Sequence, residues 1–148
     1  MNNITFKEFL NLEFKLIENN PVLKYPWNSF VIADPSVLTP DIAHDGKFHL
    51  FCHTFFGVHH YISDDGESFK KQGKIVNRAM RPDINYIDGT YYLFYERTRP
   101  VIFNALSILG AKWESEIYCV ESKDLVNWSK PYPVIQKTRS YEEYKNGY

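Results

Sequence analysis

Asp-Gly-Lys-Phe-His-Leu-Phe at residues 45–51 recurs as Asp-Gly-Thr-Tyr-Tyr-Leu-Phe at residues 88–94. The two Asp-Gly pairs lie 43 positions apart (88 − 45). The likeness extends in both directions, because Pro-Ser-Val at 35–37 matches Pro-Asp-Ile at 82–84, and the Ser-x-Asp corner at 63–69 matches the one at 122–128. A repeat with this period indicates stacked sheet units.

Each unit is predicted to form four short strands separated by turn residues. They are expected at residues 33–38, 47–54, 58–63 and 73–76, and again at 82–86, 90–96, 116–121 and 133–135. The second strand of each unit is nearly all apolar or aromatic, so both of its faces must be covered. Such units are typical of propeller blades, with a β-sandwich as the alternative.

About two blades in 148 residues predict a partial propeller with an open apolar face, through which copies of the chain could associate. The expected division is an N-terminal segment at 1–20, blade 1 at 21–78, blade 2 at 79–137 with an insertion at 98–113, and a tail or link to a missing blade at 138–148.

The N-terminal segment contains the spacing of a capping box, Thr5-Phe6-Lys7-Glu8, which predicts a short helix or a closing strand. The apolar residues of this segment are expected to pack on blade 1. They are Phe6, Phe9, Leu10, Phe14 and Ile17.

Charge and composition argue against several functional classes. The formal net charge of −1 favours neither a nucleic acid nor an anionic membrane as partner. No apolar run approaches the ~20 residues of a membrane span, and the N-terminus lacks the features of a signal peptide, so a cytoplasmic chain is expected. Cys52 and Cys119 occupy unlike places in the two units and are predicted to be buried, reduced thiols.

One rim of the blades gathers polar side chains, because the end of an antiparallel second strand lies beside the start of the first strand. His53 is expected beside Asp34, and Glu96 beside Arg81. The repeat places Asp34 opposite Arg81 and Ser36 opposite Asp83, and strand parity puts all four on one face.

If that face lines a channel, Asp34 and Asp83 converge on a common space. Paired carboxylates suit glycoside cleavage, in which one activates water and a protonated carboxyl protonates the leaving oxygen. The alternative is structural: Asp34 opens a strand and Asp83 caps a turn. Four loop aromatics are candidates for contact with a sugar ring: Trp27, Phe55, Phe56 and Trp113.

No metal or cofactor is predicted. The five histidines do not form a ligand set in the sequence, since the adjacent His59 and His60 should point to opposite faces of one strand. The chain also lacks a phosphate loop, a nucleophile elbow and zinc-ligand spacing.

The motifs together resemble glycoside hydrolase family 43. The resemblance rests on Ala-Asp-Pro-Ser-Val-Leu at 33–38, the Asp-Gly-Lys-Phe-x-Leu-Phe strand, the Ser-x-Asp-Gly-x-x-Phe corner and Arg81-Pro82-Asp83, and covers roughly residues 20–136. It implies a five-bladed propeller, shared with relatives such as family 32. It also implies an inverting hydrolase for arabinofuranosides and xylosides of plant oligo- or polysaccharides.

The resemblance implies that Asp34 is the general base and that Asp83 lies in the substrate pocket. Arg81, Glu96, His53, Trp27 and Phe55 are the expected substrate-binding residues. No residue matches the family's general acid, so the chain is predicted to be an incomplete, inactive fragment. A noncatalytic carbohydrate-binding propeller and a protein-interaction propeller are the alternatives.

Overall fold

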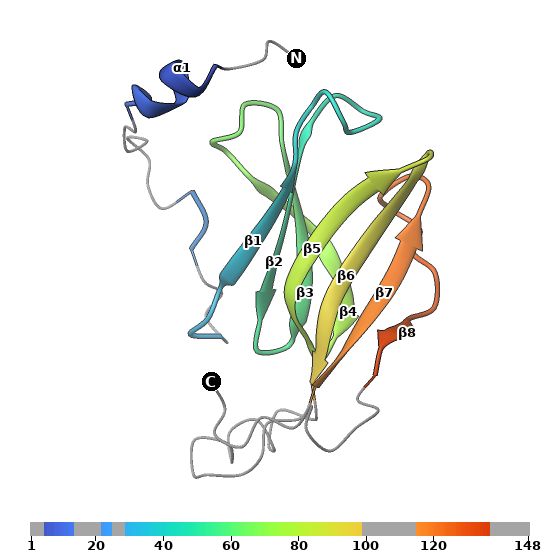
Figure 1. Cartoon of the computed structure of the whole chain (residues 1–148). Coiled ribbons are helices and arrows are strands. Elements are labelled where there is room, and N and C mark those ends of the chain that lie inside the picture. Colours follow the sequence, from blue (N-terminus) through green and yellow to red (C-terminus); the bar gives the residue numbers. More distant parts are fainter. Residues whose placement is uncertain (1–4, 14–21, 25–28, 99–114, 137–148) are drawn as a thin grey trace.

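The two repeat copies fold into two four-stranded antiparallel sheets (Figure 1). The computed structural model of the chain describes residues 5–13, 22–24, 29–98 and 115–136. The strand order is β1-β2-β3-β4 in the first sheet and β5-β6-β7-β8 in the second, so consecutive strands are neighbours. The predicted fold class is confirmed: an all-β chain with two propeller blades and a short helix.

Every predicted strand is present, with small differences in its ends. β4 begins three residues before its predicted start because Lys70, Lys71 and Gln72 are exposed and provide no apolar signal. Blade 1 consists of β1 (Ala33–Leu38), β2 (Phe48–Thr54), β3 (Gly57–Ser63) and β4 (Lys70–Asn77). Blade 2 consists of β5 (Ala79–Ile87), β6 (Thr90–Thr98), β7 (Ser115–Ser122) and β8 (Tyr132–Ile135).

Glycines with positive φ occupy two of the tight connections, and one of these positions requires glycine. Asp88 and Gly89 join β5 to β6 with φ values of 47° and 75°, and two residues with positive φ form the hairpin turn that Asp-Gly favours. Gly57 opens β3 with a φ of 129°, where a Cβ would lie 2.0 Å from the carbonyl oxygen of Val76. Only glycine allows this close approach of β3 to β4.

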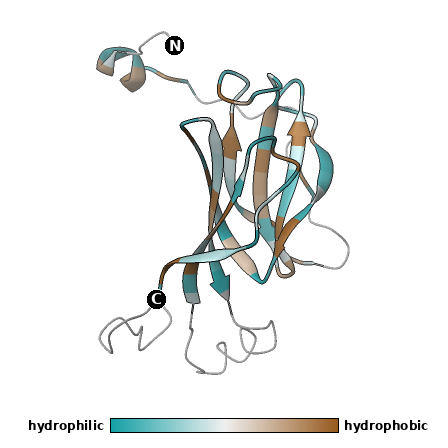
Figure 2. Ribbon diagram, turned by 90° about the vertical axis from the view of Figure 1, so that its right-hand side faces the viewer, coloured by the Kyte–Doolittle hydropathy of each residue, from teal (hydrophilic) through white to brown (hydrophobic). Residues whose placement is uncertain are grey.

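The main core lies between the blades, where alternate side chains of β2 and β6 point toward each other. Phe51 from blade 1 and Leu93 from blade 2 are fully buried in it. Burying a side chain of this size contributes about 1.5–3 kcal/mol, so this seam is a main source of stability. Figure 2 shows the brown apolar stretches on strands of both blades.

The outer faces of the two blades are covered unequally. On blade 1, Leu50 and Cys52 are buried beneath Leu23 and Ile32. On blade 2, the alternation of β6 turns Tyr92 and Phe94 away from blade 1, where they are half-buried and stack with centroids 6.4 Å apart. Both cysteines are free and buried, as predicted.

The N-terminal helix α1 (Phe6–Leu10) forms as the capping box predicts. The Thr5 hydroxyl accepts the Glu8 N–H, and the Glu8 carboxylate accepts the Thr5 N–H. The predicted packing on blade 1 is wrong for the helix itself: Phe6, Phe9 and Leu10 are exposed, and α1 lies apart from both sheets (Figures 1 and 2). Its five residues are too few to bury an apolar stripe.

Several predictions concern segments outside this description. Phe14, Ile17, residues 99–113 of the insertion and the tail at 138–148 lie outside the described residues. The domain boundaries at residues 20, 78 and 137 stay predictions. Within the described ranges, no helix has the length and apolar character needed to cross a bilayer.

Candidate active site

The rim of the two blades is shaped by a β-bulge at the same place in each repeat. Asp34-Pro35 interrupts the pairing of β1 with β2, and Arg81-Pro82 interrupts the pairing of β5 with β6. Asp34 and Arg81 have φ values of 50° and 49°, in the left-handed region. That conformation costs a residue with a Cβ about 1 kcal/mol, and strain of this kind concentrates at functional sites.

Each bulge directs its left-handed residue toward the end of the neighbouring strand. Asp34 meets His53 of β2, with 3.5 Å between the Asp34 Oδ2 and His53 Nδ1 atoms. In blade 2 the Arg81 guanidinium donates to the Glu96 carboxylate of β6. The two pairs occupy equivalent positions in the repeat. Blade 1 has a carboxylate beside an imidazole there, and blade 2 has a guanidinium beside a carboxylate.

Arg81 joins the two pairs into one cluster. Its Nε atom lies 4.0 Å from Asp34 Oδ2, while its Nη1 atom binds Glu96. Its backbone N–H also donates to His53 Nδ1 at 3.3 Å. The structure therefore brings together four of the predicted site residues: Asp34, His53, Arg81 and Glu96.

His53 is held in its neutral form. Burial lowers the pKa of His53, and the charge of Arg81 adds to this effect, whereas the carboxylates of Asp34 and Glu96 oppose it. Because Nδ1 accepts the Arg81 N–H, the proton of the neutral ring lies on Nε2. At neutral pH, His53 therefore donates no hydrogen bond from Nδ1 to Asp34.

Asp34 and Glu96 differ in what they can do chemically. The Asp34 side chain is half-exposed at the rim, so its carboxylate is open to water and to ligands. The Glu96 side chain is buried and bound to a guanidinium. A carboxylate held this way does not serve as a proton donor unless the ion pair breaks.

The remaining predicted site residues are Asp83, Phe55 and Trp27. Asp83 is exposed and accepts a hydrogen bond of 2.9 Å from the Asn85 side chain. Among the described residues, no hydrogen bond or ion pair links Asp83 to the Arg81 cluster. Phe55 is 41% exposed in the β2–β3 turn, at the same end of blade 1 as Asp34. Trp27 lies outside the described residues.

Two serines that the sequence analysis did not select support the rim. The Ser36 hydroxyl accepts the Ile84 N–H at 3.0 Å and so ties β1 to β5 just beyond the bulges. The buried Ser29 hydroxyl accepts the Phe55 N–H at 3.4 Å. The match of Ser36 to Asp83 in the repeat could have identified Ser36 as a rim residue. Ser29 lies outside the repeat, and no motif points to it.

Within the described part of the chain, no group of three or more His, Cys, Asp or Glu side chains is arranged to hold a metal ion. The cluster instead offers an exposed carboxylate beside a guanidinium, a set suited to binding hydroxyl groups and accepting a proton from water.

Comparison with known proteins identifies the fold. No family model matches the chain, and no curated protein matches it. Among solved structures, a crystal structure of an exo-1,5-α-L-arabinanase from a bovine ruminal metagenomic library is 20% identical, with a TM-score of 0.52 over 74% of this chain. A family 43 endo-arabinanase from Bacillus licheniformis is 18% identical, with a TM-score of 0.48; 66% of this chain and 35% of that chain are covered.

The likeness to the first structure confirms the predicted family 43-like fold. The chain spans only 38% of the length of that arabinanase.

Proposed function

We propose that this chain provides the general-base side of an inverting glycoside hydrolase site for arabinofuranosides or xylosides, with Asp34 as the base. The observation that carries the proposal is the Asp34 carboxylate, which a strained bulge holds half-exposed at the rim, 4.0 Å from Arg81 Nε. The arabinanase-like fold supports the same reaction class.

In the proposed reaction, Asp34 accepts a proton from a water molecule as the water oxygen bonds to the anomeric carbon. The bond from that carbon to the leaving oxygen breaks, and its electron pair stays on the leaving oxygen. Arg81 orients the Asp34 carboxylate and donates to a sugar hydroxyl. Asp83 and Phe55 bind the sugar from the neighbouring strand and turn.

The leaving oxygen still needs a proton, and we assign no described residue to that role. Glu96 is unsuited because it is bound to Arg81. A positioned acid is worth about 10²–10⁴-fold in rate. We therefore expect the isolated chain to be inactive on polysaccharides, whose leaving alkoxides need protonation, and to act slowly on glycosides with a stable leaving anion.

The test is hydrolysis of 2,4-dinitrophenyl and phenyl arabinofuranosides and xylosides. We expect turnover of a dinitrophenyl substrate only, because dinitrophenolate leaves without a proton. Asp34→Asn should lower that rate by about 10²–10⁴-fold. The matched control is Asp64→Asn, since Asp64 is an exposed aspartate paired with Lys47 and lies in the Ser-x-Asp corner. Equal rates for the chain and its Asp34→Asn variant would contradict the proposal.

A noncatalytic carbohydrate-binding role is the second candidate, and the engagement of Glu96 with Arg81 favours it. It predicts that Asp34→Asn leaves sugar affinity intact and that no aryl glycoside is turned over.

A protein-interaction role is favoured instead by the half-buried, stacked Tyr92 and Phe94 on the outer face of blade 2. Self-association through this face predicts a concentration-dependent mass in light scattering, which Tyr92→Ser should abolish. A monomer at every concentration would exclude self-association.

A further inference from the structure

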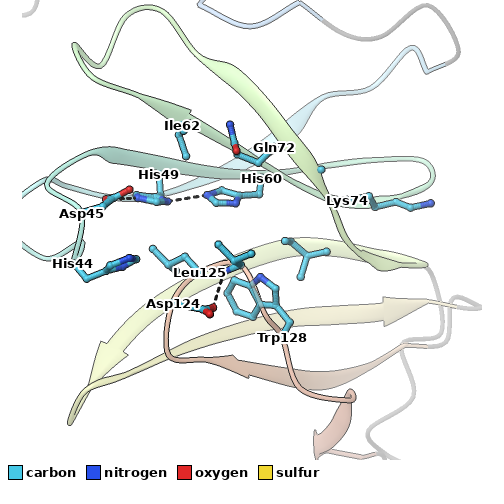
Figure 3. Close-up of a pocket in the computed structure, with 13 residues that line it drawn as sticks. His44, Asp45, His49, His60, Ile62, Gln72, Lys74, Asp124, Leu125 and Trp128 are labelled. Atoms are coloured by element: carbon cyan, nitrogen blue, oxygen red, sulfur yellow. Dashed lines mark hydrogen bonds and ion pairs between the residues drawn. The ribbon is translucent and has the colours of Figure 1, made fainter.

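A pocket lies in the seam between the blades, at the end opposite the Asp34 rim. Its volume is about 520 Å³. His49 and His60 form its blade 1 wall, and Leu125 and Trp128, from the corner after β7, lie across from them (Figure 3). His49 and His53 are four residues apart on β2, so the pocket is roughly 13 Å from the rim.

A chain of hydrogen bonds runs along the blade 1 wall. Asp45 Oδ1 lies 2.8 Å from His49 Nε2, and His49 Nδ1 lies 2.8 Å from His60 Nε2. Both imidazoles are almost fully buried. Burial also lowers the pKa of His60 to about 4, so this ring is neutral at physiological pH.

The hydrogen bonds occupy three of the four ring nitrogens in this chain. Asp45 only accepts, so His49 donates from Nε2 to the carboxylate. His49 Nδ1 and His60 Nε2 bond to each other, so His60 Nδ1 is the ring nitrogen left for another partner. The described structure records no hydrogen bond to that atom.

The opposite wall presents the complementary group. The indole Nε1–H of Trp128 is buried and has no hydrogen-bond partner among the described residues. An unsatisfied buried donor costs about 1–3 kcal/mol, so a native site is expected to supply an acceptor. Phe51 connects the two walls, since it stacks on His60 at 4.6 Å and meets Trp128 edge-on at 6.0 Å.

The two histidines have no imidazole counterparts in blade 2. The repeat places Tyr92 and Cys119 of blade 2 at the positions of His49 and His60. The same strand register is therefore built without imidazoles there. The hydrogen-bonded chain is therefore not a general feature of the repeat.

We propose that the seam pocket binds a neutral, hydroxyl-rich small molecule of monosaccharide size. A ligand hydroxyl group can either donate to or accept from His60 Nδ1, and the unpaired Trp128 Nε1–H on the opposite wall can donate to a second ligand oxygen. The half-buried side chains of Trp128 and Ile75, which also line the pocket, provide apolar contact for a sugar face. The volume falls in the range of roughly 300–1,000 Å³ of small-molecule sites and greatly exceeds the roughly 30 Å³ of one water.

Charge also favours a neutral ligand. The Asp124 carboxylate is engaged by the backbone N–H groups of Val126 and Asn127 and by the Ser122 hydroxyl. The other charged side chains of the lining are Asp45 and Lys74, which carry opposite charges. The proposal is independent of the reaction assigned to the Asp34 rim.

The test follows the tryptophan indole and histidine ring signals by ¹H–¹⁵N NMR while D-xylose is added to the whole chain. The chain has three tryptophans, so Trp128→Phe assigns the relevant indole signal. We expect a saturable shift of the Trp128 N–H with xylose. Methanol, which offers one hydroxyl without a ring, should give no saturable shift.

Variants distinguish the loss of a ligand contact from a general effect on packing. Trp128→Phe and His60→Phe should each weaken binding about tenfold, because each removes one hydrogen bond. For Trp128→Phe, the His60 ring signals replace the lost indole signal. His59→Phe is the matched control, since His59 is also buried but bonds to Thr54 on the other face of β3. Asp34→Asn should leave the xylose shift unchanged.

An absent xylose shift, an equal response to methanol, or equal weakening by His59→Phe and His60→Phe would each overturn the proposal.

Discussion

Stability of the chain should fall as the pH is lowered from 7 to 5, because neutral histidines are buried in blade 1. Burial lowers the pKa values of both His59 and His60 from 6.5 to about 4. Below pH 6.5 the unfolded chain takes up protons that the folded chain excludes, so protonation favours unfolding. The loss begins near pH 6.5, grows until about pH 4, and stays constant below that.

The size of the effect follows from the two pKa values. For each histidine, the pKa is about 2.5 lower in the folded chain than in the unfolded chain. Once the pH is below both pKa values, this difference lowers the free energy of unfolding by roughly 3 kcal/mol per histidine. At pH 5 about 2 kcal/mol per histidine is already lost. Burial lowers the pKa of His53 too, and this adds to the loss. Asp45, whose pKa is lowered from 3.8, contributes only at more acidic pH.

Urea unfolding followed by circular dichroism at pH 7 and pH 5 measures this loss. His60→Phe keeps a ring stacked on Phe51 and should reduce the difference in unfolding free energy between pH 7 and pH 5 by about 2 kcal/mol. His59→Phe should reduce this difference by a similar amount. His44→Phe is the control, since His44 is exposed. An unchanged pH dependence in both His59→Phe and His60→Phe would refute the reasoning.

Three further changes test the packing of the blades, each measured as the free energy of unfolding in urea. Gly57→Ala should cost at least about 3 kcal/mol because its Cβ would overlap the Val76 carbonyl, whereas Gly89→Ala, which meets nothing within 4 Å, should cost only about 1 kcal/mol; equal costs would contradict the close approach. Arg81→Met should cost about 2 kcal/mol because it removes the Arg81 guanidinium from the buried Glu96 carboxylate, and adding Glu96→Gln should restore part of that loss; no restoration would mean that the pair is not coupled. Leu93→Ala should cost about 2–5 kcal/mol, since this side chain is fully buried in the seam; a cost below 1 kcal/mol would place Leu93 outside the core.

The fold could be predicted because its signals are local. The Asp-Gly turns and the apolar second strands each lie within a few residues, and β1 has the bounds that its pattern predicts. Two failures have physical causes. The predicted packing of α1 on blade 1 was wrong, because the periodicity of a sequence shows which helix face is apolar but not what covers that face. The start of β4 was missed because its first residues are exposed and polar.

The rim was predictable in part. Antiparallel geometry predicts that Asp34 lies near His53 and that Arg81 lies near Glu96, and the structure has both contacts. The sequence did not reveal the bulges at Asp34 and Arg81, because an argument from strand parity assumes that side chains alternate between the two faces without interruption. The pairing of His49 with His60 depends on the register of β2 against β3, which places Phe51 opposite His60. No short pattern in the sequence reports such a register.

The configuration of the sugar first released from dinitrophenyl α-L-arabinofuranoside tests the role of Asp34 most directly. If Asp34 activates water, NMR during the first turnovers should show the inverted β-anomer, and Asp34→Asn should abolish its formation. Release of the α-anomer would make the carboxylate a nucleophile instead of a base. Retention of configuration, or inversion that persists in Asp34→Asn, would contradict the account.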